Sequence, residues 1–271
     1  MRVAPMSQMT RLASRDAIVE VAPRKSETAG PMEPKVEGEG PAQPWRRQFW
    51  RKGLLGACAA AAGLYALTPA PRGLCSKTLC VIAFGDSLSA GTGLAKEDGF
   101  PAALNAKLRA EGYPVEVLNG GVGGDTSAKG LARLKEALKA RADVAIVEFG
   151  ANDLLKGVAP AALRQNLEAM VAGFQSGNTR VLLAGFRLAK APPPLRNPAF
   201  DAVYPEVAGK FGIALHPYFL RATMTEEHVL TYLLQSDGAH PNAQGVRKIV
   251  EDVAPFVERE LDAVLSSRAQ R

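Results

Sequence analysis

The chain has 271 residues, of which 47% are hydrophobic and 22% charged, and this composition excludes a disordered, collagen-like or many-pass membrane protein. Residues 1–74 carry 11 Lys or Arg against 6 Asp or Glu, whereas residues 75–271 carry 22 against 21, so the formal charge of +6 belongs mainly to the N-terminal part. Because no basic stripe interleaved with aromatic residues remains in the body, we do not expect nucleic acid as a partner.

The N-terminal part divides into two segments of different character. Residues 1–44 are polar and lack hydrophobic periodicity, so we expect them to be disordered or to be an extension upstream of the true start. In residues 45–74 a cationic stretch precedes an apolar run at 54–67, which is the layout of an export signal. The run is shorter than the ~20 residues that span a bilayer, which favours a signal, with an uncleaved membrane tether and a buried Ala-rich helix as alternatives. We therefore predict export, to the periplasm or to the periplasmic side of the inner membrane.

Residues 75–271 form one predicted domain in which apolar runs of strand length alternate with amphipathic stretches. The expected strands are 79–84, 115–118, 144–149, 180–184 and 212–215, and the expected helices are 101–110, 127–140, 160–175, 199–210 and 243–265. This alternation is typical of an α/β protein with a parallel sheet, whose right-handed crossovers place helices on both faces. We predict a three-layer α/β/α sandwich, flavodoxin-like, with about five parallel strands.

The segments that follow the strands carry the polar residues of interest. They are residues 85–89 after the first strand, 119–126 after the second and 150–153 after the third, with 237–242 ahead of the last helix. In such sheets ligands bind outside the carboxyl ends of the strands. We therefore expect these segments to lie on one rim.

A hydroxyl and an imidazole on this rim have the pattern of a nucleophile and its base. Ser87 lies in a tight turn, and a hydroxyl needs a neighbouring base to become a nucleophile. His240 follows Asp237 by three residues, a spacing that lets the carboxylate reach Nδ1 and leaves Nε2 free, although an ordinary turn and a helix cap explain each motif alone. His216 and His228 are expected to be structural or solvated.

Two further groups on the rim are candidate donors to an oxyanion. The backbone N–H of Gly124 lies in a glycine-rich loop, and the side chain of Asn152 follows the third strand. The glycine spacing fits neither a dinucleotide-binding nor a phosphate-binding loop. The acids Glu148, Asp125 and Asp153 are expected to orient loops.

The three cysteines do not define a disulfide framework or a zinc site, and we expect no metal and no cofactor. Cys80 falls where the first strand begins, so an isolated buried thiol is the preferred interpretation. A disulfide with Cys75 in an oxidising compartment is the alternative.

Together, these segments resemble the four sequence blocks of the SGNH (GDSL) hydrolase superfamily, from about residue 79 to 265. They are Gly85-Asp-Ser-Leu-Ser, Gly124-Asp-Thr, Gly150-Ala-Asn-Asp and Asp237-Gly-Ala-His-Pro-Asn, and the chain is most similar to the bacterial acyl-CoA thioesterase, arylesterase and lysophospholipase branch. The resemblance implies Ser87 as nucleophile with Asp237 and His240 completing a triad. It also implies the N–H groups of Ser87 and Gly124 and the amide of Asn152 as the oxyanion hole.

The resemblance implies a serine esterase or thioesterase that acts through an acyl-enzyme on a small acyl ester or thioester. Ala239 departs from the branch, which usually has Leu or Ile there, and the proline-rich segment 191–197 is stiffer than expected. Both departures bear on acyl-chain preference. The alternatives are a carbohydrate or aryl acetylesterase and a non-catalytic envelope binding module. Membrane association through the apolar run at 54–67 is a separate expectation.

Overall fold

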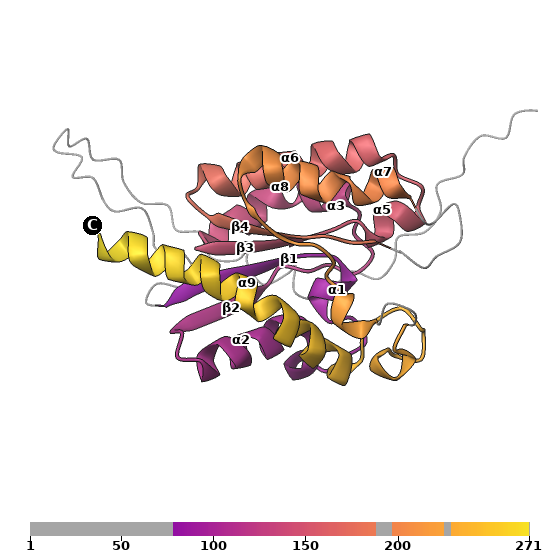
Figure 1. The fold of residues 1–271 in the computed structure, drawn as a ribbon, viewed down its shortest axis with the longest axis horizontal. Helices are drawn as coiled ribbons and strands as arrows, with labels where there is room; N and C mark the ends of the chain where they lie inside the picture. Colours follow the sequence, from indigo (N-terminus) through magenta and orange to yellow (C-terminus); the bar gives the residue numbers. More distant parts are fainter. Residues whose placement is uncertain (1–77, 188–196, 225–228, 271) are drawn as a thin grey trace, which may run out of the picture. The chain divides into compact units, whose positions relative to one another are not determined.

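A parallel five-stranded sheet with strand order β2-β1-β3-β4-β5 forms the middle layer of the fold (Figure 1). The computed structural model describes residues 78–187, 197–224 and 229–270. The strands are β1 (Leu79–Gly85), β2 (Val115–Asn119), β3 (Val144–Glu148), β4 (Arg180–Ala184) and β5 (Ala214–His216). All four neighbouring pairs are parallel, which confirms the predicted α/β class.

Helices cover both faces of the sheet and complete the predicted three layers (Figure 1). On one side α2 (Phe100–Ala110) packs against α9 (Ala243–Ala269), and on the other α6 (Pro160–Ser176) packs against α3 (Ser127–Ala132) and α8 (Val203–Phe211). Strands β1 and β3 are buried along their whole length. This explains their continuous apolar sequences, because a central parallel strand has no face toward water.

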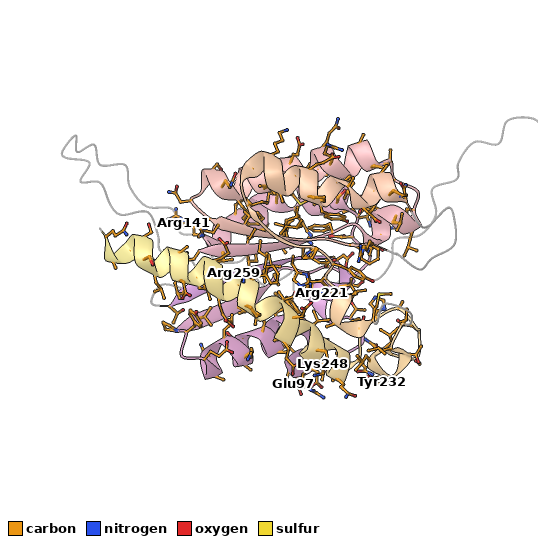
Figure 2. The ribbon with its side chains drawn as sticks, viewed as in Figure 1. Glu97, Arg141, Arg221, Tyr232, Lys248 and Arg259 are labelled. Atoms are coloured by element: carbon orange, nitrogen blue, oxygen red, sulfur yellow. The ribbon has the colours of Figure 1, made fainter. Side chains whose placement is uncertain are left out.

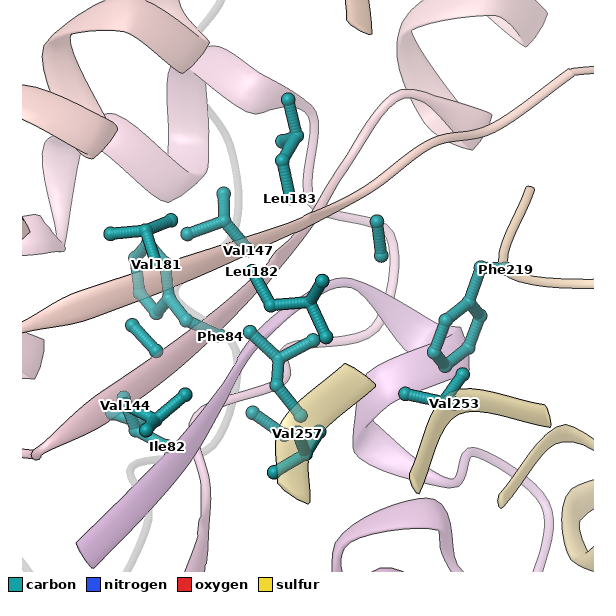
Figure 3. Packing of buried hydrophobic residues seen from close by; sticks show 14 of the residues in the cluster. Ile82, Phe84, Val144, Val147, Val181, Leu182, Leu183, Phe219, Val253 and Val257 are labelled. Atoms are coloured by element: carbon teal, nitrogen blue, oxygen red, sulfur yellow. The ribbon is translucent and has the colours of Figure 1, made fainter. Parts of the chain in front are cut away.

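The core joins the long C-terminal helix to the sheet. Figure 3 shows Val253 and Val257 of α9 beside Phe219 and the sheet residue Leu182. All four side chains are almost completely buried. The apolar stripe expected on the last helix is therefore the face that α9 turns to the sheet, and the helix itself continues to Ala269.

The structure corrects several predicted boundaries. The helix expected at 127–140 is divided into α3, α4 (Leu134–Ala137) and the 3-10 turn η3 (Leu138–Ala140), and the break falls at Arg133. The helix expected at 199–210 is divided into α7 (Pro198–Asp201) and α8. The last strand begins at Ala214 and not at residue 212, because Gly212 ends α8 in a left-handed conformation with φ +61°.

Short helical segments that the sequence pattern did not indicate lie in the connections. They are α1 (Ser87–Ala90), α5 (Ala151–Leu155), and the 3-10 turns η2 (Lys96–Asp98), η4 (Arg221–Thr223) and η5 (Thr231–Leu233). One turn of helix is too short to show a hydrophobic period. Two of these segments, α1 and α5, follow the carboxyl ends of central strands.

Cys80 corrects the prediction of an isolated thiol, because it is disulfide-bonded. Its side chain is buried at the start of β1, as expected. Burial was therefore a correct inference, but a disulfide is also apolar and tolerates the same position. Which cysteine it joins lies outside the described residues.

Several expectations concern parts of the chain outside the described residues. They are the disordered or extra segment 1–44, the export signal or tether at 45–74, the proline-rich loop up to residue 196, and His228. Within the described ranges, none of the helices combines the length and the apolar character that a bilayer span needs.

Candidate active site

The predicted rim is a cavity of about 480 Å³ whose wall contains a residue from each of the four polar segments. Ser87 comes from the segment after β1, Gly124 from the one after β2, Asn152 from the one after β3, and His240 from the turn before α9. The structure thus brings together residues separated by up to 153 positions in the chain.

A chain of hydrogen bonds connects the predicted nucleophile, base and acid. The Nε2 atom of His240 lies 2.9 Å from the Oγ atom of Ser87, and its Nδ1 atom lies 2.6 Å from the Oδ2 atom of Asp237. With Nδ1 as the donor to the carboxylate, Nε2 is left as the acceptor that faces the hydroxyl. In this geometry the Nε2 atom of His240 can accept the hydroxyl proton of Ser87.

The Asp237 carboxylate is held by its own turn. Its Oδ1 atom accepts the backbone N–H groups of Ala239 and His240, both at 3.0 Å. The backbone N–H of Ala239, followed by the hydrogen bond to the imidazole, holds the pKa of Asp237 well below its usual range. Asp237 is therefore an anion throughout the neutral range, which favours an Nδ1–H on His240.

Ser87 is the first residue of α1, directly after the buried Asp86. The Oδ1 atom of Asp86 caps this short helix by accepting the backbone N–H of Leu88 at 3.0 Å. Gly85 precedes them because a Cβ there would lie 2.2 Å from the Ser89 hydroxyl oxygen. The tight passage from β1 into α1 thus places Ser87 at the cavity wall.

The two backbone donors of the predicted oxyanion hole have no competing partner. Among the described residues, the N–H groups of Ser87 and Gly124 donate no hydrogen bond to a protein atom. Gly124 has φ +78°, and no heavy atom lies within 4 Å of the position that a Cβ would take. The loop therefore leaves its backbone open to the cavity.

Asn152 is the second residue of α5, and its Nδ2 atom donates to Oδ2 of Asp86 at 3.1 Å. The turn before it depends on Gly150, which has φ +132°. The Tyr204 hydroxyl donates to the carbonyl of Phe149 at 3.0 Å and fills the space next to Gly150. A Cβ at residue 150 would lie only 1.9 Å from that hydroxyl.

A second carboxyl group lies behind Asp86. Glu148 is completely buried, and its Oε2 atom accepts the Ser89 hydroxyl at 2.9 Å and the backbone N–H of Asp86 at 3.4 Å. Its Oε1 atom has no hydrogen-bond partner among the described residues. Burial raises the pKa of Asp86 to about 6, so its carboxyl is mostly ionised at neutral pH, and burial together with the nearby Asp86 charge raises the pKa of Glu148 well above its usual value.

The other two acids expected to orient loops do form such contacts. Asp153 accepts both the backbone N–H of Ser127 at 2.8 Å and its hydroxyl at 2.5 Å, which joins α5 to α3. Asp125 accepts the Arg133 guanidinium at 2.7 Å.

Arg133 is a structural residue of the site that the sequence did not reveal. Besides Asp125, its guanidinium donates to the carbonyls of Gly120 and Gly85 at 2.6 and 2.7 Å, and it stacks 4.4 Å from the ring centre of Phe84. It thus joins the segments that carry Ser87 and Gly124. In the sequence it was one position in an expected helix, and nothing indicated that its side chain turns inward.

His216 is buried away from the cavity, as its structural assignment predicts. Its Nε2 atom lies 3.0 Å from Oδ2 of Asp252 on α9, and its ring packs edge-on against Phe256. Asp252 also pairs with Arg221 of η4, which Figure 2 labels. This cluster fastens the segment after β5 to α9.

The rest of the cavity wall is predominantly apolar. It includes Leu155, Phe186, Tyr218, Leu220, Met224 and Leu234, together with Ala239. No group of three or more potential metal-ligating side chains occurs in the described ranges. The arrangement therefore combines a hydroxyl that is hydrogen-bonded to an imidazole, backbone N–H groups that have no protein acceptor among the described residues, and an apolar wall.

Residues 83–248 match the GDSL-like Lipase/Acylhydrolase family. The chain is similar to "Esterase TesA" of Pseudomonas aeruginosa, with 37% identity over 197 residues that cover 72% of this chain and 95% of the relative. It is also similar to "Thioesterase 1/protease 1/lysophospholipase L1" of Escherichia coli K12, with 35% identity over 187 residues that cover 69% of this chain and 82% of the relative. Among solved structures, AlinE4, an SGNH-hydrolase family esterase, aligns with a TM-score of 0.55 and 40% identity over 68% of this chain and 97% of AlinE4.

Proposed function

The chain belongs to the GDSL-like lipase/acylhydrolase family, and on that premise we propose that it hydrolyses acyl esters and thioesters through an acyl-enzyme on Ser87. The observation that carries the proposal is the hydrogen-bonded chain from Ser87 through His240 to Asp237 at the wall of an apolar cavity. Relatives named as esterase and as thioesterase and lysophospholipase support this substrate class.

Acylation begins when Ser87 attacks the substrate carbonyl. The Nε2 atom of His240 accepts the hydroxyl proton as the new C–O bond forms, and proton transfer of this kind contributes about 10²–10⁴ in rate. Asp237 keeps the imidazole in the required tautomer and stabilises the imidazolium that results.

The negative charge that develops on the carbonyl oxygen needs donors that are already in place. We assign this role to the N–H groups of Ser87 and Gly124 and the amide of Asn152, because all three residues line the cavity, and each such donor is worth about 3 kcal/mol. These donors bind the tetrahedral intermediate more strongly than the planar carbonyl, which is the requirement for catalysis.

The intermediate collapses when the His240 imidazolium gives its proton to the leaving oxygen or sulfur. The alcohol or thiol departs, and the acyl group remains on Ser87. A water molecule then attacks the ester, with His240 accepting its proton, and the acid leaves as the Ser87 hydroxyl is restored.

The nucleophile is tested by Ser87→Ala in the full chain. We expect loss of turnover and loss of fluorophosphonate labelling, because no acyl-enzyme can form. Ser176→Ala is the matched control, since Ser176 is an exposed serine at the end of α6 whose hydroxyl donates to the Gly173 carbonyl. Turnover close to that of the wild type in Ser87→Ala would exclude this mechanism.

The substrate class is tested with ester and thioester series of increasing acyl length. Each methylene buried against the apolar wall contributes about 0.8 kcal/mol, so kcat/KM should rise about fourfold per methylene until the cavity is full. A fast acetyl ester with no gain on lengthening would instead identify an acetylesterase.

We also propose that the chain is exported to the periplasm or held at the inner membrane by its N-terminal apolar segment. The cationic stretch followed by the apolar run at 54–67 supports this location. The disulfide at Cys80 adds independent support, since disulfides persist in oxidising compartments. Recovery of the full-length chain in the cytosolic fraction of lysed cells would contradict export.

A further inference from the structure

We propose that Asp86 is a positioning residue for the oxyanion hole, acting through the side-chain amide of Asn152. This inference rests on the proposed function, in which Asn152 donates to the oxyanion. Asp86 itself is completely buried and does not line the cavity, so it has no direct contact with substrate.

The two oxygens of the Asp86 carboxylate accept hydrogen bonds from two different elements, α1 and α5. Oδ1 accepts the backbone N–H of Leu88 and so holds the start of α1, which carries Ser87. Oδ2 accepts Nδ2 of Asn152 on α5. A single side chain therefore sets the position of the nucleophile relative to the amide donor.

The chemistry of a carboxylate also selects the orientation of the amide. An asparagine side chain can turn over and exchange its oxygen with its NH₂ group, and an ionised carboxylate accepts hydrogen bonds but cannot donate them. Asn152 must therefore present its NH₂ group to Asp86. One N–H is used by Asp86, and the second is left for the cavity that Asn152 lines.

The surroundings of Asp86 support this use of its charge. Glu148 and Ser89 lie behind it, and the Ser89 hydroxyl is already committed to Glu148 at 2.9 Å. A buried carboxylate is costly unless it is hydrogen-bonded, and two groups that donate to the Asp86 carboxylate, the backbone N–H of Leu88 and the amide of Asn152, belong to the elements that carry the site. A simple helix cap at this place would need only the first of these two contacts.

The test is a double-mutant cycle in the full chain with Asp86→Asn and Asn152→Ala, in which kcat and KM are measured on a short-chain p-nitrophenyl ester. An Asn at 86 can still cap α1, but its NH₂ group faces Asn152 and favours the turned-over amide. We expect Asp86→Asn to lower kcat by about 10- to 100-fold with KM nearly unchanged, and Asn152→Ala to lower kcat by about 10²–10³-fold. In the Asn152→Ala background, Asp86→Asn should have almost no further effect.

A second variant separates positioning from folding. Asp86→Ser keeps a good helix-capping side chain and removes the acceptor for Asn152, so it should reproduce the loss of kcat while thermal unfolding stays cooperative. Asp98→Asn, at an exposed acid of η2, is the matched control and should leave kcat unchanged.

The outcomes distinguish this inference from the proposed function. Two results would overturn the positioning role and leave the proposed function intact. One is a fold-loss of kcat in the double variant equal to the product of the two single losses, and the other is a wild-type kcat in Asp86→Asn. A wild-type kcat in Asn152→Ala would remove Asn152 from the oxyanion hole, and the role of Asp86 with it.

Discussion

The Asp237 carboxylate shows how much a few neighbouring residues can determine. It accepts two backbone N–H groups from its own turn and also the Nδ1 side of His240, three residues along the chain. Gly238 has φ +68°, which lets this tight turn close. The orientation of the His240 ring is therefore a local property of Asp237-Gly-Ala-His.

Replacing this acid tests the local role. Asp237→Asn keeps the size of the side chain but favours the wrong tautomer of His240, so kcat should fall by about 10²–10⁴-fold while the fold persists. The measurement is kcat and KM on a p-nitrophenyl ester, with thermal unfolding recorded in parallel. A kcat equal to that of the Asp98→Asn control would show that Asp237 does not direct the imidazole.

At the scale of elements, the turns that follow the strands decide where Ser87 and Asn152 lie. The turn from β3 into α5 passes so close to the Tyr204 hydroxyl that residue 150 has no room for a side chain. The turn from β1 into α1 is similarly tight at Gly85. Because parallel strands end at the same edge, these turns bring Ser87 and Asn152 to one cavity.

The β3–α5 turn is tested by Gly150→Ala. The positive φ costs about 1–2 kcal/mol for a residue with a Cβ, and displacement of Tyr204 adds about 1–3 kcal/mol. We expect both a lower free energy of unfolding in urea and a lower kcat, since α5 carries Asn152.

Gly212→Ala is the control for strain alone. Gly212 also has a positive φ, but no heavy atom lies within 4 Å of its missing Cβ, and it does not line the cavity. This variant should lose about 1 kcal/mol of stability and keep the wild-type kcat. Equal losses of stability in Gly150→Ala and Gly212→Ala would mean that the contact with Tyr204 does not contribute to the loss.

At the scale of the whole molecule, the buried carboxyl pair makes stability depend on pH. Burial raises the pKa of Asp86 to about 6 and raises the pKa of Glu148 well above its usual value. Between the unfolded and folded pKa values of such an acid, the folded protein binds more protons than the unfolded chain. Stability therefore falls as pH rises through this window.

Glu148→Gln tests this effect, because the amide keeps the shape and an acceptor for Ser89 but cannot ionise. The variant should gain stability relative to the wild type as pH rises from about 5 to about 8, and the gain should shrink toward the acid end. Urea unfolding at several pH values measures the difference in free energy of unfolding between the variant and the wild type. The contributions of the other titrating groups largely cancel in this difference. A difference that does not change with pH would contradict a raised pKa for the buried Glu148 carboxyl.

Long elements with a regular hydrophobic pattern could be predicted from the sequence, whereas short or divided elements could not. The central strands and α2, α6 and α9 follow from apolar runs and stripes in the sequence, because burial of those residues is what stabilises them. The side chain of Arg133, at the break between α3 and α4, donates to the carbonyls of Gly85 and Gly120, which lie far from it in the chain. At Cys80 the sequence favours an isolated thiol, with the disulfide only the alternative, because burial alone does not distinguish a thiol from a disulfide.

The sequence by itself determined the α/β class, the five strands and the Asp237–His240 pair. The hydrophobic period and the three-residue spacing depend only on residues that are close together in the chain. The sequence also identified Ser87, Gly124 and Asn152 as candidates, and their catalytic roles stay predictions. Only the tertiary structure decided that His240 meets Ser87 across 153 positions, and that Asp86 holds Asn152 across 66. Such contacts depend on how the crossovers return each strand end to the same edge of the sheet, and no local pattern in the chain records that distance.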